Sequence, residues 1–316
     1  MSSICFIVVY FGKLPSNFNL WLNSCKYNKT IDFILITDDK TDFEFPENVK
    51  VIYMSFDKLV CRFQGVFDYK IKLEAPYKLC DYKPAYGEAF QDYIKGYEYW
   101  GYCDIDLIWG DIRSFVTEKV LRENQRILTR GHCSIFPNTK ESNMMYRTLT
   151  SEGCQNAKDV YQSSQNCCYD EWAQHCGYGI SEIFKRNNVK QYDEVIFADI
   201  NFLKYKFYPN NRGVLHKYKN VILEFKEGKL YLVYNCKGEV SYEEVMYAHF
   251  QKRFLETRKN SNETFWIIPP NKVVDNINDL SKYKLQKLTF RRGINIFVIK
   301  FRVNQIKKKA RQILKI

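Results

Sequence analysis

Two carboxylates, Asp104 and Asp106, stand one residue apart where an apolar stretch of the chain ends. The aromatic run from Tyr97 to Tyr102 just before them predicts a short strand. Because a strand alternates its side chains between two faces, both carboxylates point the same way, and a Mg²⁺ or Mn²⁺ ion held there would bridge to the phosphates of a ligand. About one Asp-x-Asp is expected by chance in a chain of this length. The alternative is an acidic turn that merely closes a strand. The surrounding elements must therefore distinguish a cation site from such a turn.

The first half of the chain alternates predicted strands and helices. Strands are expected over 4–10, 31–37 and 49–54, with helices over 18–25 and after a cap at Ser55. This rhythm predicts a mainly parallel sheet covered on both faces. The first turn lacks Gly-x-Gly-x-x-Gly, which argues against a dinucleotide site. A further helix is expected to start at Lys83, with Pro84 in its first turn, and to lead into the acidic strand.

The second half of the chain offers further elements around these acids. We expect a strand over 126–130, a loop and helix above the site over 137–166, an amphipathic helix opened by 168–172, a hairpin over 221–234 with its turn at Glu227-Gly228, and a helix over 242–245.

Composition narrows the class of protein. With 316 residues and 46% hydrophobic content, the chain can bury the core of one large α/β domain, alone or with an appendage. No signal peptide and no run of 18 apolar residues is apparent, so we expect neither secretion by a signal peptide nor a membrane span. The eleven cysteines include no Cys-x-x-Cys pair, which favours free thiols in a reducing cytoplasm. A zinc site at Cys167, Cys168, His175 and Cys176 is the alternative, but its spacing matches no usual ligand pattern.

The net charge of +12 is concentrated at the C-terminal end. Residues 281–316 hold twelve Lys or Arg and no acid, which leaves 36 basic and 36 acidic residues elsewhere. A neutral body argues against nucleic-acid binding by the fold. Four apolar side chains, Ile294, Phe297, Val298 and Phe301, share one predicted helical face, which favours an amphipathic anchor on an anionic membrane surface. A solvated C-terminal helix is the alternative.

Taken together, the motifs resemble those of GT-A-type glycosyltransferases of bacterial polysaccharide synthesis. The resemblance covers about residues 3 to 255 and is carried in order by 8–12, 36–39, 80–87, 104–106, 169–171 and 248–253. It implies a GT-A-like, Rossmann-type mixed sheet with helices on both faces. The implied domains are a catalytic domain over 1–258 and an extension over 259–316 that ends in the basic amphipathic helical tail.

The resemblance also implies a metal and donor site. Asp104 and Asp106 would bind Mn²⁺ or Mg²⁺ together with His249, and Lys252 would contact the diphosphate of a nucleotide sugar. Lys83 matches a basic residue that contacts donor sugar or phosphate, although a solvated lysine at a helix end is the alternative. A metal with one ammonium would stabilise the diphosphate leaving group without proton transfer.

Other residues are assigned to the nucleotide and the acceptor. Tyr10, Phe11 and Gly12 end the first strand, where open α/β sheets bind ligands, and would hold the nucleobase, with Asp38 or Asp39 accepting from base or ribose. Ordinary turn chemistry is the alternative for both aspartates. Asp170 and Glu171 would face the acceptor hydroxyl or the reacting sugar, either as a general base in an inverting enzyme or as a stabiliser in a retaining one; an acidic helix N-terminus is the alternative. His132 is a further candidate for this pocket.

We therefore predict a cytoplasmic enzyme, peripheral at the inner face of the cell membrane. It would move a sugar from a nucleotide-diphosphate donor, a UDP-sugar being expected, to a hydroxyl of a glycan or lipid-linked acceptor in cell-surface polysaccharide synthesis. The alternatives are a nucleotidyltransferase acting on a sugar phosphate and a non-enzymatic nucleic-acid-binding protein that uses the basic tail.

Overall fold

The computed structural model describes residues 1–172, 175–212, 217–251, 253–256 and 263–291, with Ile299, Arg302, Val303 and Ile306. The chain divides into two compact units. Unit 1 comprises Met1–Leu14, Cys25–Ile105 and Arg113–Glu194, and unit 2 comprises Pro15–Ser24, Asp106–Ile112 and Val195–Ile316. Each unit is therefore assembled from three separate stretches of the chain.

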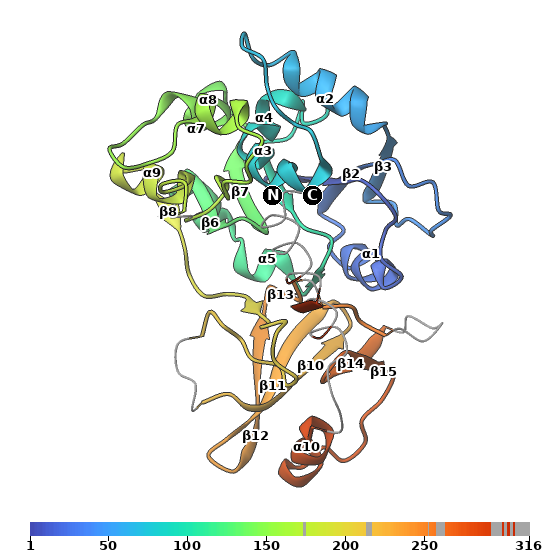
Figure 1. Ribbon diagram of the computed structural model, residues 1–316. Coiled ribbons are helices and arrows are strands. Elements are labelled where there is room, and N and C mark those ends of the chain that lie inside the picture. Colours follow the sequence, from blue (N-terminus) through green and yellow to red (C-terminus); the bar gives the residue numbers. More distant parts are fainter. Residues whose placement is uncertain are drawn as a thin grey trace. The chain divides into compact units, whose positions relative to one another are not determined.

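Unit 1 contains a seven-stranded mixed sheet of order β3-β2-β1-β4-β7-β6-β8 (Figure 1). Its strands are β1 (Ile4–Tyr10), β2 (Ile31–Thr37), β3 (Val49–Tyr53), β4 (Tyr99–Cys103), β6 (Arg126–Arg130), β7 (Cys133–Pro137) and β8 (Gln191–Tyr192). β1 runs parallel to β2 and to β4, whereas β7 is antiparallel to β4 and to β6. The expected mixed α/β class is confirmed.

Short helices connect these strands. They are α1 (Phe18–Lys26), α2 (Phe56–Gln64), α3 (Leu79–Tyr82), α4 (Tyr86–Ala89), α5 (Ile112–Phe115), α6 (Glu118–Glu123), α7 (Lys140–Thr148), α8 (Ala157–Gln162) and α9 (Ile180–Arg186), with 3₁₀ turns η1 (Pro76–Lys78) and η2 (Lys83–Ala85). Ser55 caps α2 as expected, because its hydroxyl accepts a hydrogen bond from the backbone N–H of Lys58. The helix expected from Lys83 begins instead as η2 and continues as the four-residue α4.

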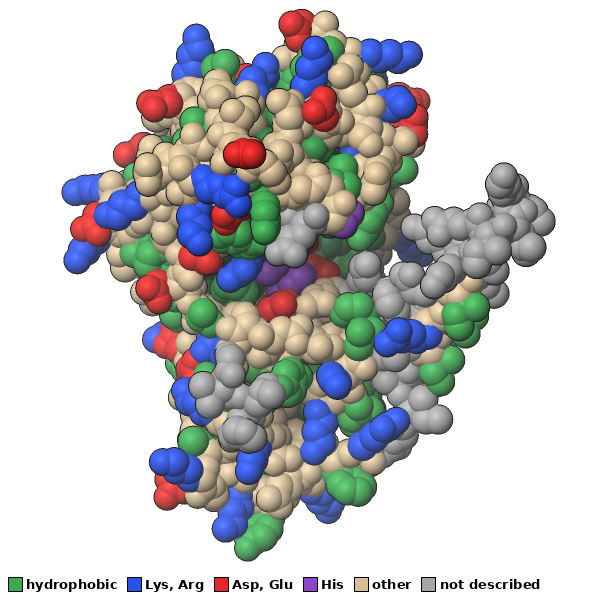
Figure 2. Space-filling model, turned by 60° about the vertical axis from the view of Figure 1, so that its left-hand side comes forward, with side chains coloured by type: hydrophobic (Ala, Val, Ile, Leu, Met, Phe, Trp, Pro, Cys, Tyr) green, Lys and Arg blue, Asp and Glu red, His purple; other side chains and the backbone are tan. Residues whose placement is uncertain are grey.

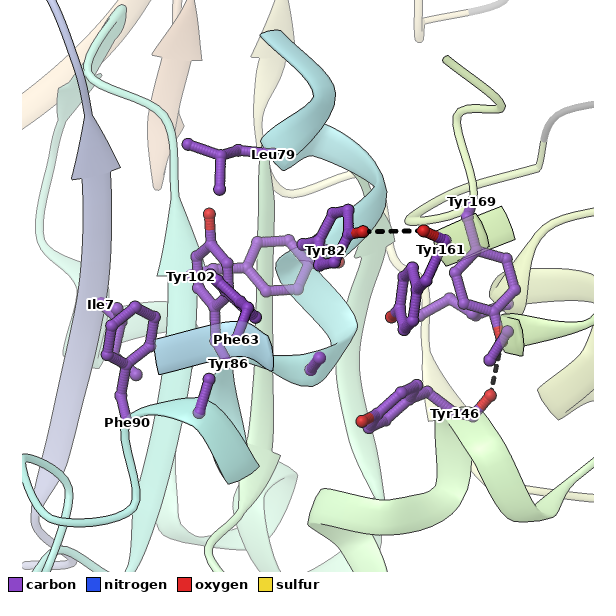
Figure 3. Close-up of a cluster of buried hydrophobic side chains, with 14 of the residues drawn as sticks. Ile7, Phe63, Leu79, Tyr82, Tyr86, Phe90, Tyr102, Tyr146, Tyr161 and Tyr169 are labelled. Atoms are coloured by element: carbon purple, nitrogen blue, oxygen red, sulfur yellow. Dashed lines mark hydrogen bonds between the residues drawn. The ribbon is translucent and has the colours of Figure 1, made fainter. Parts of the chain in front are cut away.

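A buried aromatic cluster packs the helices onto one face of this sheet (Figure 3). Tyr102 from β4 lies in it with Phe63 from α2 and Tyr82 from α3. The Tyr82 ring stacks on Tyr161 from α8 at 4.4 Å between centroids, and the Tyr82 hydroxyl donates to the Tyr161 carbonyl at 3.0 Å. Tyr169 is also fully buried here. Since stacked aromatic pairs add to burial, the cluster fixes the backbone next to Lys83 and Asp170.

Unit 2 contains two further sheets. One has five strands in the order β12-β11-β10-β14-β15, and the other has three in the order β5-β13-β9. Their bounds are β5 (Leu107–Trp109), β9 (Ala198–Asp199), β10 (Lys219–Lys226), β11 (Lys229–Cys236), β12 (Glu239–Val245), β13 (Tyr247–His249), β14 (Thr264–Ile268) and β15 (Lys272–Val274). The expected hairpin is confirmed as β10 and β11, with its turn at Glu227 (φ 48°) and Gly228 (φ 83°).

Two expected helices are wrong. Residues 242–245 form the end of strand β12, which pairs antiparallel with β11 after a two-residue turn at Lys237 (φ 50°) and Gly238 (φ 97°). Residues 168–172 are turn, with Cys168 at a φ of 50°, and the next helix, α9, begins only at Ile180. Asp170 and Glu171 therefore do not lie at a helix N-terminus.

The C-terminal region joins unit 2 through helix α10 (Lys282–Thr289). Leu285 of this helix is buried against Ile222, Val233 and Trp266 of the five-stranded sheet. The sheet itself continues past residue 258, because β14 pairs with β10. The division of function at residue 258 stays a prediction. The four apolar residues of the expected membrane-facing helix, Ile294, Phe297, Val298 and Phe301, lie outside the described residues.

Two surface properties bear on the expected partners. In the described part of the chain, no helix is both long and apolar enough to cross a membrane. Figure 2 shows Lys and Arg side chains at many separate places on the face that it draws, with Asp and Glu side chains near several of them. The absence of a nucleic-acid partner stays a prediction.

Candidate functional site

Strand pairing places Asp106 beside His249. Asp106 precedes β5, and β5 pairs antiparallel with β13 so that Leu107 lies opposite His249. The backbone N–H of Phe250 donates to the Asp106 carbonyl at 3.0 Å, which extends this pairing by one residue. As a result, Nε2 of His249 lies 3.5 Å from Oδ1 of Asp106. Two residues separated by more than a hundred positions in the sequence are thus brought together; their binding of a metal stays a prediction.

Asp104 joins this pair through the continuity of the chain. It stands two residues before Asp106, directly after β4, and its backbone N–H donates to the His132 carbonyl at 3.0 Å. One ligand atom from each of Asp104, Asp106 and His249 lies within 4.8 Å of the other two, and all three residues are half-buried. Among the described residues this is the group of His, Cys, Asp and Glu side chains that is placed to share a metal.

The donor atoms present suit a divalent cation. Oδ1 of Asp106 is buried and accepts no hydrogen bond of acceptable geometry from any described residue. Its charged neighbour is Nε2 of His249 at 3.5 Å. A buried carboxylate oxygen that accepts no short hydrogen bond is costly, and a bound cation would offset this cost. Carboxylate oxygens suit Mg²⁺ and Mn²⁺, and an imidazole nitrogen is a common ligand of transition metals. The residues are therefore compatible with a divalent metal ion; its identity as Mn²⁺ or Mg²⁺ stays a prediction.

The charge on His249 reflects the acids around it. Burial lowers the pKa of His249, but the Asp106 and Asp199 carboxylates outweigh burial and raise this pKa to about 10. Nδ1 of His249 lies 2.9 Å from Oδ1 of Asp199. Asp199 was not among the predicted site residues. Its signal in the sequence is an acid inside the apolar run 195–200, where a strand was not expected.

Lys83 contacts the first carboxylate of the motif. Its Nζ donates to Oδ1 of Asp104 at 2.6 Å and to the Gly131 carbonyl at 2.6 Å, and it lies 3.7 Å from Oδ2 of Asp170. The Lys83 side chain is only 9% exposed. Burial lowers the pKa of Lys83, but Asp104 and Asp170 raise it well above its ordinary value. The reading of Lys83 as a solvated lysine is wrong; its contact with a donor phosphate stays a prediction.

Asp170 is buried in the same part of unit 1. Burial raises the pKa of Asp170 to about 8, even though the Lys83 ammonium lowers it. A Cβ added at Gly131 would lie 2.6 Å from Oδ2 of Asp170, so the absence of a side chain at Gly131 makes room for this carboxyl. Glu171 is half-exposed. The roles of both acids toward an acceptor stay predictions.

A second buried pair holds the segment that carries Asp170. Asp81, which is fully buried, accepts hydrogen bonds from the backbone N–H groups of Cys167 and Tyr169, both at 2.9 Å. Lys78 donates to the same carboxylate at 2.8 Å. Sequence reasoning missed this role of Asp81, although the residue stands two positions before Lys83. The sequence shows the acid but not its burial, so it gave no signal for this role.

The predicted nucleotide-binding residues lie at the end of β1. Gly12 has a φ of 94°, and its N–H donates to Oδ1 of Asp38 at 2.8 Å. Asp39 accepts from the backbone N–H of Leu14 at 2.7 Å and from Thr41. Both aspartates thus organise the loop after β1. Whether Asp38 also contacts a nucleotide stays a prediction.

The aromatic residues of this loop have separate environments. The Phe11 ring packs edge-on against Phe56 at 5.4 Å between centroids, and the Tyr10 hydroxyl donates to the Lys13 carbonyl at 3.3 Å. Stacking of Tyr10 or Phe11 on a nucleobase stays a prediction.

Two other predictions concern Lys252 and the alternative zinc site. Lys252 lies outside the described residues. The alternative zinc site finds no support, because the described residues Cys167, Cys168, His175 and Cys176 do not form a group placed to share a metal. Nε2 of His175 lies instead 3.0 Å from the Asn166 carbonyl oxygen.

Comparison with known proteins gives a family without an assigned activity. No curated protein matches this chain. The galactosyltransferase LgtC, solved in complex with donor and acceptor sugar analogues, is 9% identical over 62% of this chain and 75% of that chain, with a TM-score of 0.34. The apo-form glycosyltransferase GlyE of Streptococcus pneumoniae TIGR4 is 8% identical over 62% of this chain and 46% of that chain, with a TM-score of 0.30. A sequence model of one family matches residues 6–276, so the chain belongs to the family of unknown function DUF6625.

Proposed function

We propose that this protein is a metal-dependent glycosyltransferase that uses a nucleotide-diphosphate sugar, with UDP-sugar as the expected donor. The observation that carries the proposal is the pair of Asp106 and His249, whose side chains lie 3.5 Å apart, with Asp104 two residues earlier at the end of β4, which runs parallel to β1. Open α/β sheets bind ligands at the carboxyl ends of such strands. Two carboxylates and an imidazole there suit a cation that also binds a diphosphate.

Each residue has a chemical task in this proposal. When bound, Mn²⁺ or Mg²⁺ would supply positive charge to the diphosphate leaving group. Asp104, Asp106 and His249 would hold the ion. Lys83 holds Asp104 in place through its hydrogen bond at 2.6 Å. Because its other contacts are the Gly131 carbonyl and Asp170, we assign Lys83 to positioning the carboxylates rather than to binding the donor phosphate directly.

The acceptor would be a hydroxyl of a glycan or of a lipid-linked glycan in cell-surface polysaccharide synthesis. The twelve basic residues over 281–316 support a location at the inner face of the cell membrane, where such acceptors reside. Of the predicted acids, Glu171 is half-exposed and Asp170 is buried, so Glu171 is the better placed to meet a bulky acceptor. The configuration of the product distinguishes an inverting from a retaining enzyme.

A donor screen tests the proposal. The full chain is incubated with UDP-, GDP- and dTDP-sugars in the presence of Mn²⁺, Mg²⁺ or EDTA, and the released nucleoside diphosphate is measured. We expect release from one donor class that is abolished by EDTA and lowered at least a hundredfold by Asp106→Asn, the range seen when charge stabilisation of a leaving group is removed. Asp275→Asn, which changes an exposed carboxylate, should leave the rate unchanged.

The alternatives give different results in the same experiment. Consumption of a nucleoside triphosphate and a sugar phosphate, with release of pyrophosphate, would identify a nucleotidyltransferase. Full activity of a folded Asp104→Ala/Asp106→Ala variant would show that the acids are structural.

A further inference from the structure

We propose that Asp199 is a positioning residue, which fixes the His249 imidazole so that Nε2 is directed to the metal beside Asp106. The proposal rests on the metal site proposed above. Oδ1 of Asp199 lies 2.9 Å from Nδ1 of His249, while Nε2 lies 3.5 Å from Oδ1 of Asp106. An ionised carboxylate accepts hydrogen bonds and donates none, so Nδ1 carries the hydrogen in this contact. In the neutral imidazole the lone pair is then on Nε2, the atom that faces Asp106.

The pairing of two backbone strands determines this arrangement. Asp199 and His249 lie at matching positions of the parallel strands β9 and β13. The backbone N–H of Ile200 donates to the His249 carbonyl at 2.9 Å, which fixes the register. A shift by one residue would turn either side chain to the opposite face. The two strands thus place the acid next to the ring nitrogen that is farther from Asp106.

Asp199 is itself held from several sides. Gln251 donates through Nε2 to the same Oδ1 at 2.9 Å. The Asp199 backbone N–H donates to Oδ1 of Asn211 at 3.0 Å, and its carbonyl accepts from the Asn210 N–H at 2.8 Å. These contacts restrain the carboxylate, and through it the imidazole ring. Such a restrained partner is what a metal-binding histidine needs to keep one ring orientation.

The competing interpretation is that Asp199 and His249 form an ion pair that only stabilises the fold. The two interpretations differ in measurable ways. A purely structural acid would change the unfolding of the metal-free protein and leave metal affinity untouched. A positioning acid would change metal affinity and would also fix which ring nitrogen carries hydrogen when the metal is bound. Partners of metal-binding histidines typically contribute about 10- to 100-fold in affinity.

The test measures Mn²⁺ binding to the full, metal-free chain by titration calorimetry and by the EPR signal of free Mn²⁺. We expect Asp199→Ala to weaken binding by about 10- to 100-fold. Asp199→Asn keeps an oxygen that accepts from Nδ1, so its loss should be smaller. Asp275→Asn is the matched control and should bind like the wild-type protein. Thermal unfolding without metal identifies any variant that fails to fold.

Two outcomes overturn the proposal in distinguishable ways. If the wild-type protein binds Mn²⁺ and a folded Asp199→Ala variant binds it equally tightly, the positioning role is wrong and the metal site stands. If the wild-type protein binds neither Mn²⁺ nor Mg²⁺, the metal site itself is wrong, and the positioning role with it. Should both Asp199 variants fail to fold, ¹⁵N NMR of the His249 ring in the Mg²⁺-loaded wild-type protein decides. Hydrogen on Nδ1 supports the proposal, and hydrogen on Nε2 overturns it.

Discussion

The ammonium of Lys83 lies 2.6 Å from the carboxylate of Asp104, and the lysine side chain is 9% exposed while that of Asp104 is 36% exposed. The buried Lys83 side chain therefore restrains the more exposed Asp104 side chain. This ion pair differs from a surface pair, because removing the lysine leaves Asp104 without its counter-charge and Asp170 without the ammonium that lowers its pKa.

We expect Lys83→Met to lower the free energy of unfolding by about 3 kcal/mol or more, the usual cost of removing one partner of a buried ion pair. Urea denaturation followed by circular dichroism measures this. Lys50→Met is the control, since Lys50 pairs with Asp32 at 3.2 Å with 58% of its own side chain exposed. Its effect should stay below about 1 kcal/mol. Equal effects of the two substitutions would contradict the structural role of Lys83.

Asp81→Asn should loosen the segment that carries Asp170. The substitution removes the ion pair with Lys78 and leaves one amide oxygen for the N–H groups of Cys167 and Tyr169. Because all these groups are buried, we expect a loss of about 3 kcal/mol in unfolding free energy. Limited proteolysis should also show faster cleavage within 163–172. Asp159→Asn, at an exposed position of α8, should change neither measurement.

Asp170 should make a contribution to stability that is lost as pH rises from about 4 to about 8. Its pKa is 3.8 as a free side chain and about 8 in the folded protein. Within this window the folded state holds a proton that the unfolded chain has released, so raising the pH favours unfolding. The contribution is at most about 1.4 kcal/mol per pH unit. Asp170→Asn should remove this slope, as measured by urea denaturation at several pH values. An unchanged slope would mean that Asp170 is ionised when buried.

Gly131→Ala should be destabilising, because its Cβ would lie 2.6 Å from Oδ2 of Asp170. Overpacking of this kind usually costs about 1–3 kcal/mol. Gly65→Ala is the control. Its Cβ would meet its nearest neighbour, the Arg62 carbonyl, at 3.4 Å, and its φ of −65° suits any residue. If the clash is the cause, the double variant Gly131→Ala/Asp170→Ala should lose less than the two single losses added together.

Membrane association should depend on the region after α10. Deleting all of 281–316 would remove α10, whose Leu285 is buried in the core of unit 2, so the sharper variant ends at Arg291. We expect the full chain to float with anionic liposomes in a salt-dependent way, and the shortened chain to remain unbound. Flotation of both forms would contradict the prediction that the residues after Arg291 anchor the protein to the membrane. Salt-sensitive binding to DNA or RNA, without binding to liposomes, would favour the nucleic-acid alternative.

The sequence was informative where local patterns and tertiary structure agree. Mainly apolar stretches predicted β1 and β2, and the Glu227-Gly228 turn predicted a hairpin. The same reasoning applied to Lys237-Gly238 would have identified β12, but the adjacent acids Glu243 and Glu244 suggested a helix. Pairing with β11 outweighs that weak preference, because strand propensity depends on neighbours.

The candidate site likewise contains residues that the sequence predicted and residues that it did not. Asp104, Asp106 and His249 were named as metal ligands from their motif and the family resemblance. Strand pairing places Asp106 and His249 3.5 Å apart, and their binding of a metal stays a prediction. Asp81 and Asp199 were not predicted, because each acts through a residue distant in the sequence. A buried acid is recognisable only once the backbone N–H groups or the imidazole that it binds are placed next to it.

Each unit is assembled from three separate stretches of the chain, and this limits how the two units can be separated. Unit 2 takes Pro15–Ser24 and Asp106–Ile112 from within the first half of the chain, and these stretches interrupt unit 1. A break of the chain after residue 194 would therefore leave unit 1 whole but would divide unit 2. One passage of the chain between units falls after Ile105, between the two aspartates of the motif. No single break of the chain therefore yields both units whole, and a break between the two units at this passage also separates Asp104 from Asp106.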